Sequence, residues 1–178
     1  MNTIAMKKII YPLLCIIIIT LSSFIVFSVW KIKGDQASVK FSSGKINGSF
    51  KGLNGEIEFD KEHPEKGRFS ASIEANSIAT GFFLKNSHAK DALGADKYPL
   101  IKFVSSSVAK NGNGYIAKGS LTLRGATRPA TINFTFEDKG GQAVFKGSMK
   151  VIPKEFGINR SGTPDQVNVD LIVPVAKS

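Results

Sequence analysis

The sequence predicts an all-β domain, a closed antiparallel barrel of eight strands, behind a separate apolar N-terminal segment. From Trp30 onward, apolar and polar residues alternate with a period of two, and clusters of Gly, Asn, Asp and Ser separate the alternating runs. The alternation is clear at Ile57 and Phe59, which lie beside Glu56 and Glu58. With 178 residues, the chain has room for one domain and an appendage.

The alternating runs predict eight or nine short strands. A flat open sheet of this size would leave long edges unprotected, so closure into a barrel is the simpler arrangement. Glycines such as Gly48 and Gly147 suit the bulges and coiling of a small barrel, and the KNGNG sequence at 110–114 predicts a tight hairpin turn. The expected strands cover 39–41, 46–50, 56–60, 69–75, 100–108, 115–123, 132–136, 145–151 and 167–175.

One stretch interrupts the alternation. Between Thr80 and Pro99 the period of two disappears, and residues 82–93 predict a short helix or an ordered loop that ends near Gly94. A helix here is expected to cap one end of the barrel.

Residues 9–29 form an uncharged apolar segment that follows Lys7 and Lys8. About 20 such residues span a bilayer, and positive charge before them predicts a cytoplasmic N-terminus and an exported C-terminal domain. Two alternatives remain open: a retained anchor, or a signal peptide cleaved near 26–28. Either way, we expect a membrane anchor or signal over 1–29 and a barrel domain over 30–178.

Cysteine content and net charge limit the classes of partner. Cys15 is the only cysteine, so the exported domain forms no internal disulfide, and the long apolar run after it argues against a lipoprotein site. The net charge is +10. Export removes nucleic acid as a partner for this positive charge. Two explanations of the charge remain: attraction to anionic lipid headgroups, or a scattered lysine surface that aids solubility.

Several segments, in order from Trp30 to Val175, resemble the YceI-like family of polyisoprenoid-binding or lipid-binding proteins. No single segment is specific, but their order and spacing are. They are ASVKF at 37–41, GLNGEIEFD at 52–60, IEANSIATG at 73–81, NSHAK at 86–90, YPLIKFVS at 98–105, GSLTLRGATR at 119–128 and IPKEFG at 152–157.

The resemblance implies a lipocalin-like antiparallel barrel whose interior holds an isoprenoid or another long-chain amphiphile. It also implies an exported or periplasmic location. The sequence departs from the family pattern at Gln36 and Lys45, where the family often has histidine, and at 92–96, where an aromatic-rich motif is missing. The mouth of the pocket is therefore expected to differ from that of relatives.

The expected ligand-binding residues are the apolar positions on the inward faces, together with one histidine. By the family resemblance, His88 lies at the start of the helix beside the pocket, where it would bond a ligand head group or, alternatively, a neighbouring loop. The full set is Ile57, Phe59, Phe69, Ile73, Phe82, His88, Phe103, Leu121, Leu123, Phe134, Phe136, Phe145, Met149, Phe156, Val169 and Leu171.

The sequence favours a binding protein over an enzyme. It has no Gly-x-Ser-x-Gly motif, and its two histidines, His63 and His88, are too few for an ordinary zinc site, so we expect no catalytic residues, no metal and no cofactor. Two functions remain: shielding a polyisoprenoid or related lipid, a quinone included, or a ligand-free structural or interaction module of the cell envelope. The oligomeric state stays open between monomer and homodimer.

Overall fold

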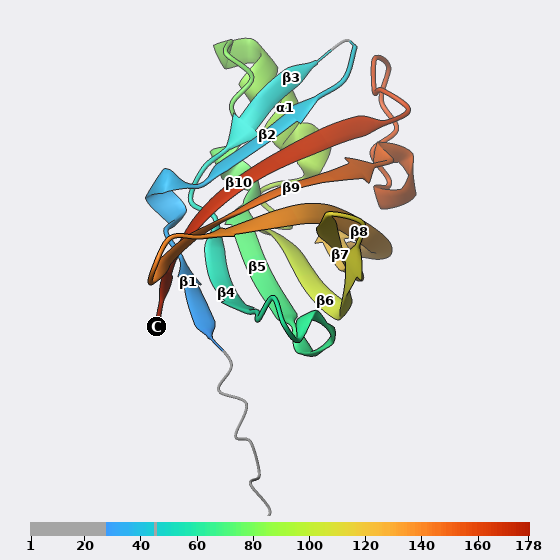
Figure 1. Cartoon of the computed structure of the whole chain (residues 1–178). Coiled ribbons are helices and arrows are strands. Elements are labelled where there is room, and N and C mark those ends of the chain that lie inside the picture. Colours follow the sequence, from blue (N-terminus) through green and yellow to red (C-terminus); the bar gives the residue numbers. More distant parts are fainter. Residues whose placement is uncertain (1–27, 45) are drawn as a thin grey trace, which may run out of the picture.

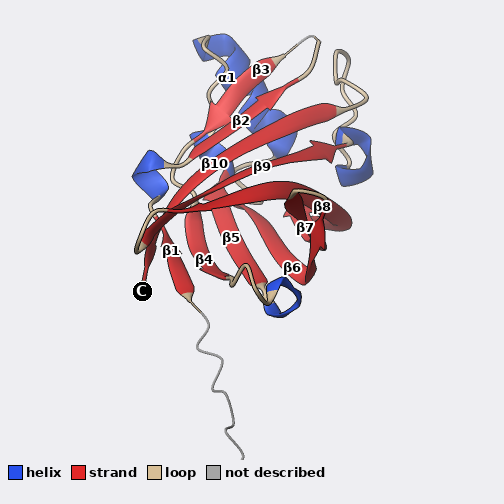
Figure 2. Cartoon of the chain, viewed as in Figure 1, coloured by secondary structure: helices blue, strands red, loops and turns tan. Residues whose placement is uncertain are grey.

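The computed structural model describes residues 28–44 and 46–178, which form ten antiparallel strands, one α-helix and four short 3-10 helices (Figures 1 and 2). The helices are η2 (Gly34–Gln36), η3 (Pro64–Lys66), η4 (Ala75–Ser77), α1 (Phe83–Leu93) and η5 (Pro153–Phe156). The strands are β1 (Val29–Ile32), β2 (Ser38–Ser42), β3 (Asn47–Phe50), β4 (Asn54–Glu58), β5 (Arg68–Glu74), β6 (Leu100–Asn111), β7 (Gly114–Leu123), β8 (Ala126–Asp138), β9 (Gln142–Val151) and β10 (Val167–Lys177).

Eight of these strands close into a ring, which confirms the predicted barrel. Their order is β1, β4, β5, β6, β7, β8, β9 and β10, and the last strand pairs back to the first (Figure 1). At the closure, Trp30 pairs with Lys177 of β10 on one side and with Ile57 of β4 on the other. Strand β1 was not among the expected strands, and its first residue, Val29, belongs to the apolar segment 9–29. Residues 9–27 of that segment lie outside the described residues.

The strand that pairs with β10 on the side away from β9 changes along its length. There β2 takes the place of β1, since Leu171 of β10 pairs with Val39 of β2, and Val39 pairs in turn with Phe50 of β3. On its other edge, β3 makes one isolated bridge, between Ser49 and Ala79, within the described residues. Ala79 and η4 therefore lie beside β3, where a further strand would otherwise continue the sheet.

The break between β1 and β2 depends on a glycine. Here η2 passes close to Leu53, the residue that precedes β4. A Cβ atom on Gly34 would lie 2.5 Å from the backbone oxygen of Leu53. Only glycine allows this approach without moving the backbone. The local sequence thus sets the point at which the wall turns from β1 to β2.

The two ends of the barrel are built differently. We call the closed end the one formed by Ser28, η3, the β6–β7 turn and Ser178; Ser178 donates its N–H to the Val29 oxygen there. We call the mouth the opposite end, formed by the β2–β3 loop, α1 and the loop at 157–166 (Figure 1). The described chain therefore begins at the closed end, away from the mouth.

Helix α1 confirms the expected helix to within one residue. It ends at Gly94, which has the left-handed φ of 60°. The N–H of Gly94 donates to the Asp91 oxygen, and the N–H of Ala95 donates to the Lys90 oxygen, both at 3.1 Å. Among the described residues, no helix has the length and apolar character needed to cross a membrane.

The hairpin turn between β6 and β7 also lies where the sequence predicts it. Asn111 pairs with Gly114, which leaves a two-residue loop, and Gly112 at its first position has φ 57°. Glycine at this position is typical of a type II′ turn, whose twist matches that of the paired strands.

Candidate functional site

The barrel encloses one large apolar cavity that opens at the mouth. Its volume is about 1030 Å³, at the upper end of the usual range for small-molecule pockets. Side chains of all ten strands, of the β2–β3 loop, of the segment around α1 and of the region 153–164 form its wall. The alternation of the strands places these side chains there, because every second residue points into the barrel.

Most of the residues that the sequence predicts for ligand binding line this cavity together. They come from seven strands and from α1 with the residue before it, and they converge from distant parts of the chain. They are Ile57, Phe69, Ile73, Phe82, His88, Phe103, Leu121, Leu123, Phe134, Phe145, Met149, Val169 and Leu171.

Phe59 and Phe136 lie inside the barrel but do not line the cavity, contrary to expectation. Phe59 is 1% exposed, and its ring packs edge-on against Phe136 with centroids 5.1 Å apart. The ring of Trp30 also packs edge-on against Phe136, with centroids 5.5 Å apart. These rings fill the closed end of the barrel. The alternation of period two correctly places Phe59 and Phe136 inside the barrel, but it does not tell whether an inward residue packs in the closed end or lines the cavity.

Phe156 is the third exception. It is 4% exposed and belongs to the hydrophobic core, but it lies in η5, which packs against β8, rather than on a strand face. Its neighbours Pro153 and Ile158 do reach the cavity wall. The short 3-10 turn, which ends at Gly157 with φ 72°, directs these side chains differently from a strand.

The cavity ends on an aromatic floor. Phe69, Phe134 and Phe145 line the cavity on one side and contact Phe59 on the other, with ring centroids 5.5 to 6.0 Å from that of Phe59. Edge-to-face contacts of this kind add to the energy of burial. The floor therefore sets the depth to which a guest can enter.

Among the wall residues that the sequence did not predict are two instructive groups. Val39, Phe41, Ile132, Val167 and Val173 line the cavity and follow the same alternation as the predicted residues, so the pattern could have identified them. The residues of the loop at 160–164 also line it. That loop has no periodicity, and no sequence signal would have found it.

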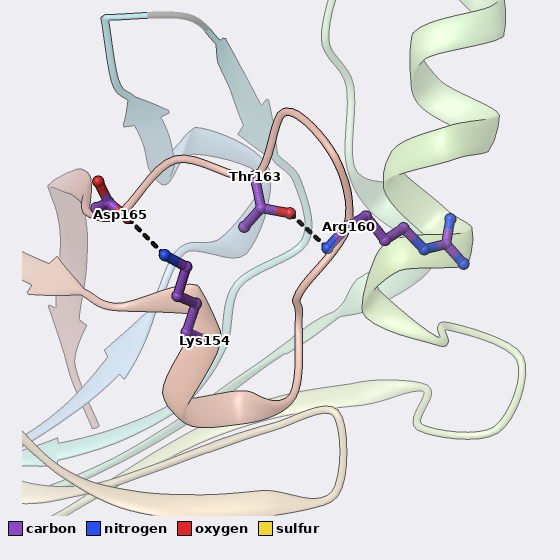
Figure 3. A network of polar contacts seen from close by, with 4 residues as sticks. All are labelled: Lys154, Arg160, Thr163 and Asp165. Carbon is purple, nitrogen blue, oxygen red and sulfur yellow. Dashed lines mark hydrogen bonds and ion pairs between the residues drawn. The ribbon is translucent and has the colours of Figure 1, made fainter.

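A network of polar contacts holds this loop at the mouth (Figure 3). The backbone N–H of Arg160 donates to Thr163 Oγ1 at 3.1 Å, and Lys154 Nζ pairs with Asp165 Oδ1 at 2.8 Å. The Arg160 guanidinium extends to α1, where Nη2 donates to the Asp91 oxygen at 3.3 Å. Arg160 thereby links two of the three segments that form the mouth.

The charged groups on the cavity wall have one sign. Lys85, Lys102 and Arg160 line it, together with the titratable His88, and within residues 28–44 and 46–178 no Asp or Glu does. Lys85 lies over the ring of Phe82, with Nζ 5.0 Å from its centroid. The mouth thus combines apolar side chains with cationic ones.

The described residues contain no group of three or more His, Cys, Asp and Glu placed to hold a metal ion. His63 lies at the closed end, with Nδ1 3.5 Å from Glu65 Oε1, while His88 lies at the mouth. The arrangement of this cavity suits the enclosure of an apolar molecule.

The positions at which the sequence departs from the family pattern lie in different places. Gln36 lies in η2 and Ala92 lines the cavity, whereas Lys45 lies outside the described residues.

Two solved structures have the same fold. One is BcnA of Burkholderia cenocepacia, with a TM-score of 0.74 and 24% identity over 80% of this chain and 98% of that one. The other is described as a polyisoprenoid binding domain from Saccharophagus degradans, with a TM-score of 0.64 and 14% identity over 86% of this chain and 100% of that one. At these identities the likeness shows the fold alone.

Sequence comparison identifies the family. The model of the YceI-like domain matches residues 30–175. A UPF0312 protein of Serratia proteamaculans is 31% identical over 156 residues, which cover 80% of this chain and 81% of that protein. Protein YceI of Salmonella newport is 30% identical over 156 residues, with 80% and 82% covered. The chain belongs to the YceI-like family.

Proposed function

We propose that this domain binds one long-chain apolar ligand, a polyisoprenoid or a related lipid, and shields it from water. The observation that carries the proposal is the cavity of about 1030 Å³, which is walled by aliphatic and aromatic side chains and open at one end. Burial of a hydrocarbon chain yields about 0.8 kcal/mol per CH₂ group, so a long chain would bind without a polar contact.

The comparisons support this ligand class. The Saccharophagus degradans neighbour is described as a polyisoprenoid binding domain. Carrying that description over to this chain is part of the proposal, because the identity is only 14%. The wall residues of this chain supply the independent argument.

A ligand-free structural module would have its interior filled by its own side chains, with phenylalanine the expected filler. Only the closed end fits that description, where Phe59 and Phe136 pack; the half next to the mouth is hollow. The hollow half favours the carrier function over a filled structural module. We accordingly propose a binding protein without catalytic activity.

We further propose an exported location. Lys7 and Lys8 before the apolar segment support a domain held at the outer face of the cytoplasmic membrane, or released into the periplasm after cleavage. Alkaline phosphatase fused after Ser178 would be active outside the membrane and inactive inside it. An inactive fusion at normal expression level would exclude export.

His88 is proposed to contact the polar end of the ligand, because it lines the cavity at the mouth on α1. The test compares retention of a polyprenol with that of a hydrocarbon of equal length in His88→Ala. Weaker retention of the polyprenol alone is expected. Equal retention of both ligands in the variant and the parent would exclude this role.

The proposed function is tested by what the domain carries. We would express residues 28–178 behind a cleavable export signal, since the closed ring and its core lie within them, then purify without detergent and identify extracted lipids by mass spectrometry. About one long-chain lipid per protein is expected. A domain that folds, carries no lipid and takes up no added polyprenol would contradict the proposal.

A further inference from the structure

Three large apolar residues at the mouth point into solvent, and we call Phe82, Phe83 and Leu84 the apolar rim. They are 65%, 84% and 71% exposed. The other large exposed apolar side chains of the described residues, such as Val104 and Ile172 on the barrel wall, have no exposed large apolar neighbour in the sequence. A consecutive exposed group of this kind marks a surface that something apolar covers.

The apolar rim is continuous with the cavity. Phe82 is both 65% exposed and part of the cavity wall, and Ile46 on the β2–β3 loop is likewise 40% exposed and part of it. An apolar surface therefore runs from the interior of the barrel to the outside. A ligand that left along this surface would reach the rim first.

Charge at the mouth fits a surface of opposite sign. Lys85 lies beside the apolar rim, whereas Arg160 lies at the mouth further along α1, where it bonds the Asp91 oxygen. In the described parts of the chain no carboxylate joins them on the cavity wall, and Asp165 of the mouth loop is paired with Lys154. Aromatic side chains next to lysine and arginine are the composition of segments that bind the interface of anionic bilayers. Lysine also extends its charge past its apolar stem, which leaves the stem available for packing.

We propose that the apolar rim docks the mouth on an anionic lipid bilayer, with Phe83 and Leu84 inserted at the level of the head groups and Lys85 and Arg160 facing the phosphates. The bilayer covers the mouth, and a ligand passes between cavity and membrane without crossing water. This inference rests on the proposed function for its purpose. The docking itself rests on the exposed residues and the charges.

The position of the N-terminus leaves the mouth available. Ser28, the first described residue, lies at the closed end, where its oxygen accepts the N–H of Phe59 at 3.2 Å. The docking surface and the point at which residues 1–27 join the barrel are therefore at opposite ends. The mouth is thus the end of the barrel that residues 1–27 leave free to contact a bilayer.

The experiment uses the full chain in nanodiscs of neutral lipid, so that the N-terminal apolar segment is already in lipid and does not itself bind added vesicles. Cys15→Ser removes the only cysteine, and Ser87→Cys then carries a polarity-sensitive dye beside the intact rim. Ser87 is exposed on α1. Asn113→Cys, at the closed end, carries the dye in the control.

Added vesicles contain phosphatidylcholine with about 30% phosphatidylglycerol and a quencher on the acyl chains. We expect a blue shift and quenching of the dye at 87, weaker binding at high salt or with neutral vesicles, and no change for the dye at 113. A dye at 87 that stays in water at every vesicle concentration would overturn the proposal.

Phe83→Ser/Leu84→Ser removes the rim residues that do not line the cavity. The matched control is Val104→Ser/Ile172→Ser, which makes the same polarity change on the barrel wall. We expect the rim variant to lose at least about tenfold in vesicle affinity and the wall variant to keep it, because insertion depends on buried apolar area.

Ligand uptake separates this proposal from the proposed function. The rim variant should bind a soluble fluorescent fatty acid as the parent does, since its cavity is unchanged. Vesicle binding without any ligand uptake would leave the docking surface standing and reject the carrier. Equal vesicle affinity in the rim and wall variants, or capture only by vesicles that contain envelope proteins, would overturn docking on lipid.

Discussion

The indole Nε1 of Trp30 donates a hydrogen bond to the backbone oxygen of Phe59, with the two atoms 3.1 Å apart. This bond joins β1 to the residue that follows β4, and it lies behind the aromatic floor of the cavity. Trp30 is 3% exposed, so water does not replace the bond if it is lost.

Trp30→Phe is expected to destabilise the domain by about 1–3 kcal/mol, because it leaves the buried Phe59 oxygen without its donor while keeping an aromatic ring beside Phe136. Urea unfolding followed by far-UV circular dichroism measures this, since Trp30 is the only tryptophan and fluorescence is lost with it. An unchanged free energy of unfolding would show that the bond contributes nothing.

Gly125→Ala is expected to cost more stability than Gly112→Ala. Both residues have a positive φ, 74° and 57°, so both changes strain the backbone by about 1 kcal/mol. A Cβ on Gly125 would also lie 2.4 Å from the ring of Tyr98, whereas one on Gly112 meets nothing within 4 Å. Overpacking adds about 1–3 kcal/mol. Equal melting temperatures for the two variants would contradict the contact with Tyr98.

Arg160→Gln is expected to loosen the mouth without changing global stability by more than about 1 kcal/mol, because its bond to the Asp91 oxygen is exposed. Hydrogen exchange of the loop at 157–166 and of the end of α1 should quicken. Lys154→Gln serves as the control, since it breaks an exposed ion pair of the same loop that does not reach α1. Identical exchange of α1 in both variants would show that Arg160 does not hold the helix.

Ala71→Phe is expected to reduce the amount of long-chain lipid that the purified domain retains, because Ala71 lines the cavity and a larger side chain fills its space. Ser70→Phe places the same ring on the adjacent residue of β5, which is exposed and outside the cavity. Mass spectrometry should find lipid in the second variant and less in the first. The same lipid content in both folded variants would place the ligand elsewhere.

Lys146→Met is expected to raise the pKa of Glu137. The hydrogen bond from Lys146 Nζ, 2.6 Å long, and its charge hold the pKa of that carboxyl below its ordinary value; the charge of Lys139 contributes less. Because the pKa of Glu137 is lower in the folded protein than in the unfolded chain, its ionised form stabilises the fold at pH values above the ordinary carboxyl pKa. That contribution is lost as the pH falls through the lowered pKa.

Carboxyl NMR titration measures this shift, with Lys139→Met as the control for charge alone. Lys146→Met should move the Glu137 midpoint further than Lys139→Met does. The side chains are exposed, so we expect little change in the melting temperature at neutral pH. A Glu137 midpoint that is the same in the parent and both variants would contradict the ion pair.

Much of the architecture could be predicted from the sequence, because local chemistry determines it. Alternation placed the inward faces correctly at positions such as Ile73, Leu121 and Val169, since successive residues of a strand point to opposite sides. Gly94 and Gly112 marked the end of α1 and the β6–β7 turn, because both positions need a positive φ. Strand β1 was not predicted, because it has four residues and overlaps the end of the apolar segment.

Only the tertiary structure decided which inward residues meet a guest and which meet one another. Phe59 and Phe134 follow the same alternation, but Phe59 lies at the centre of the packed closed end, whereas Phe134 forms part of the cavity floor. The distinction depends on how far along the barrel axis each strand is displaced, and that displacement follows from the pairing register of strands distant in the chain. Arg160 reaches the mouth for the same reason: a loop without periodicity is placed by the strands that flank it.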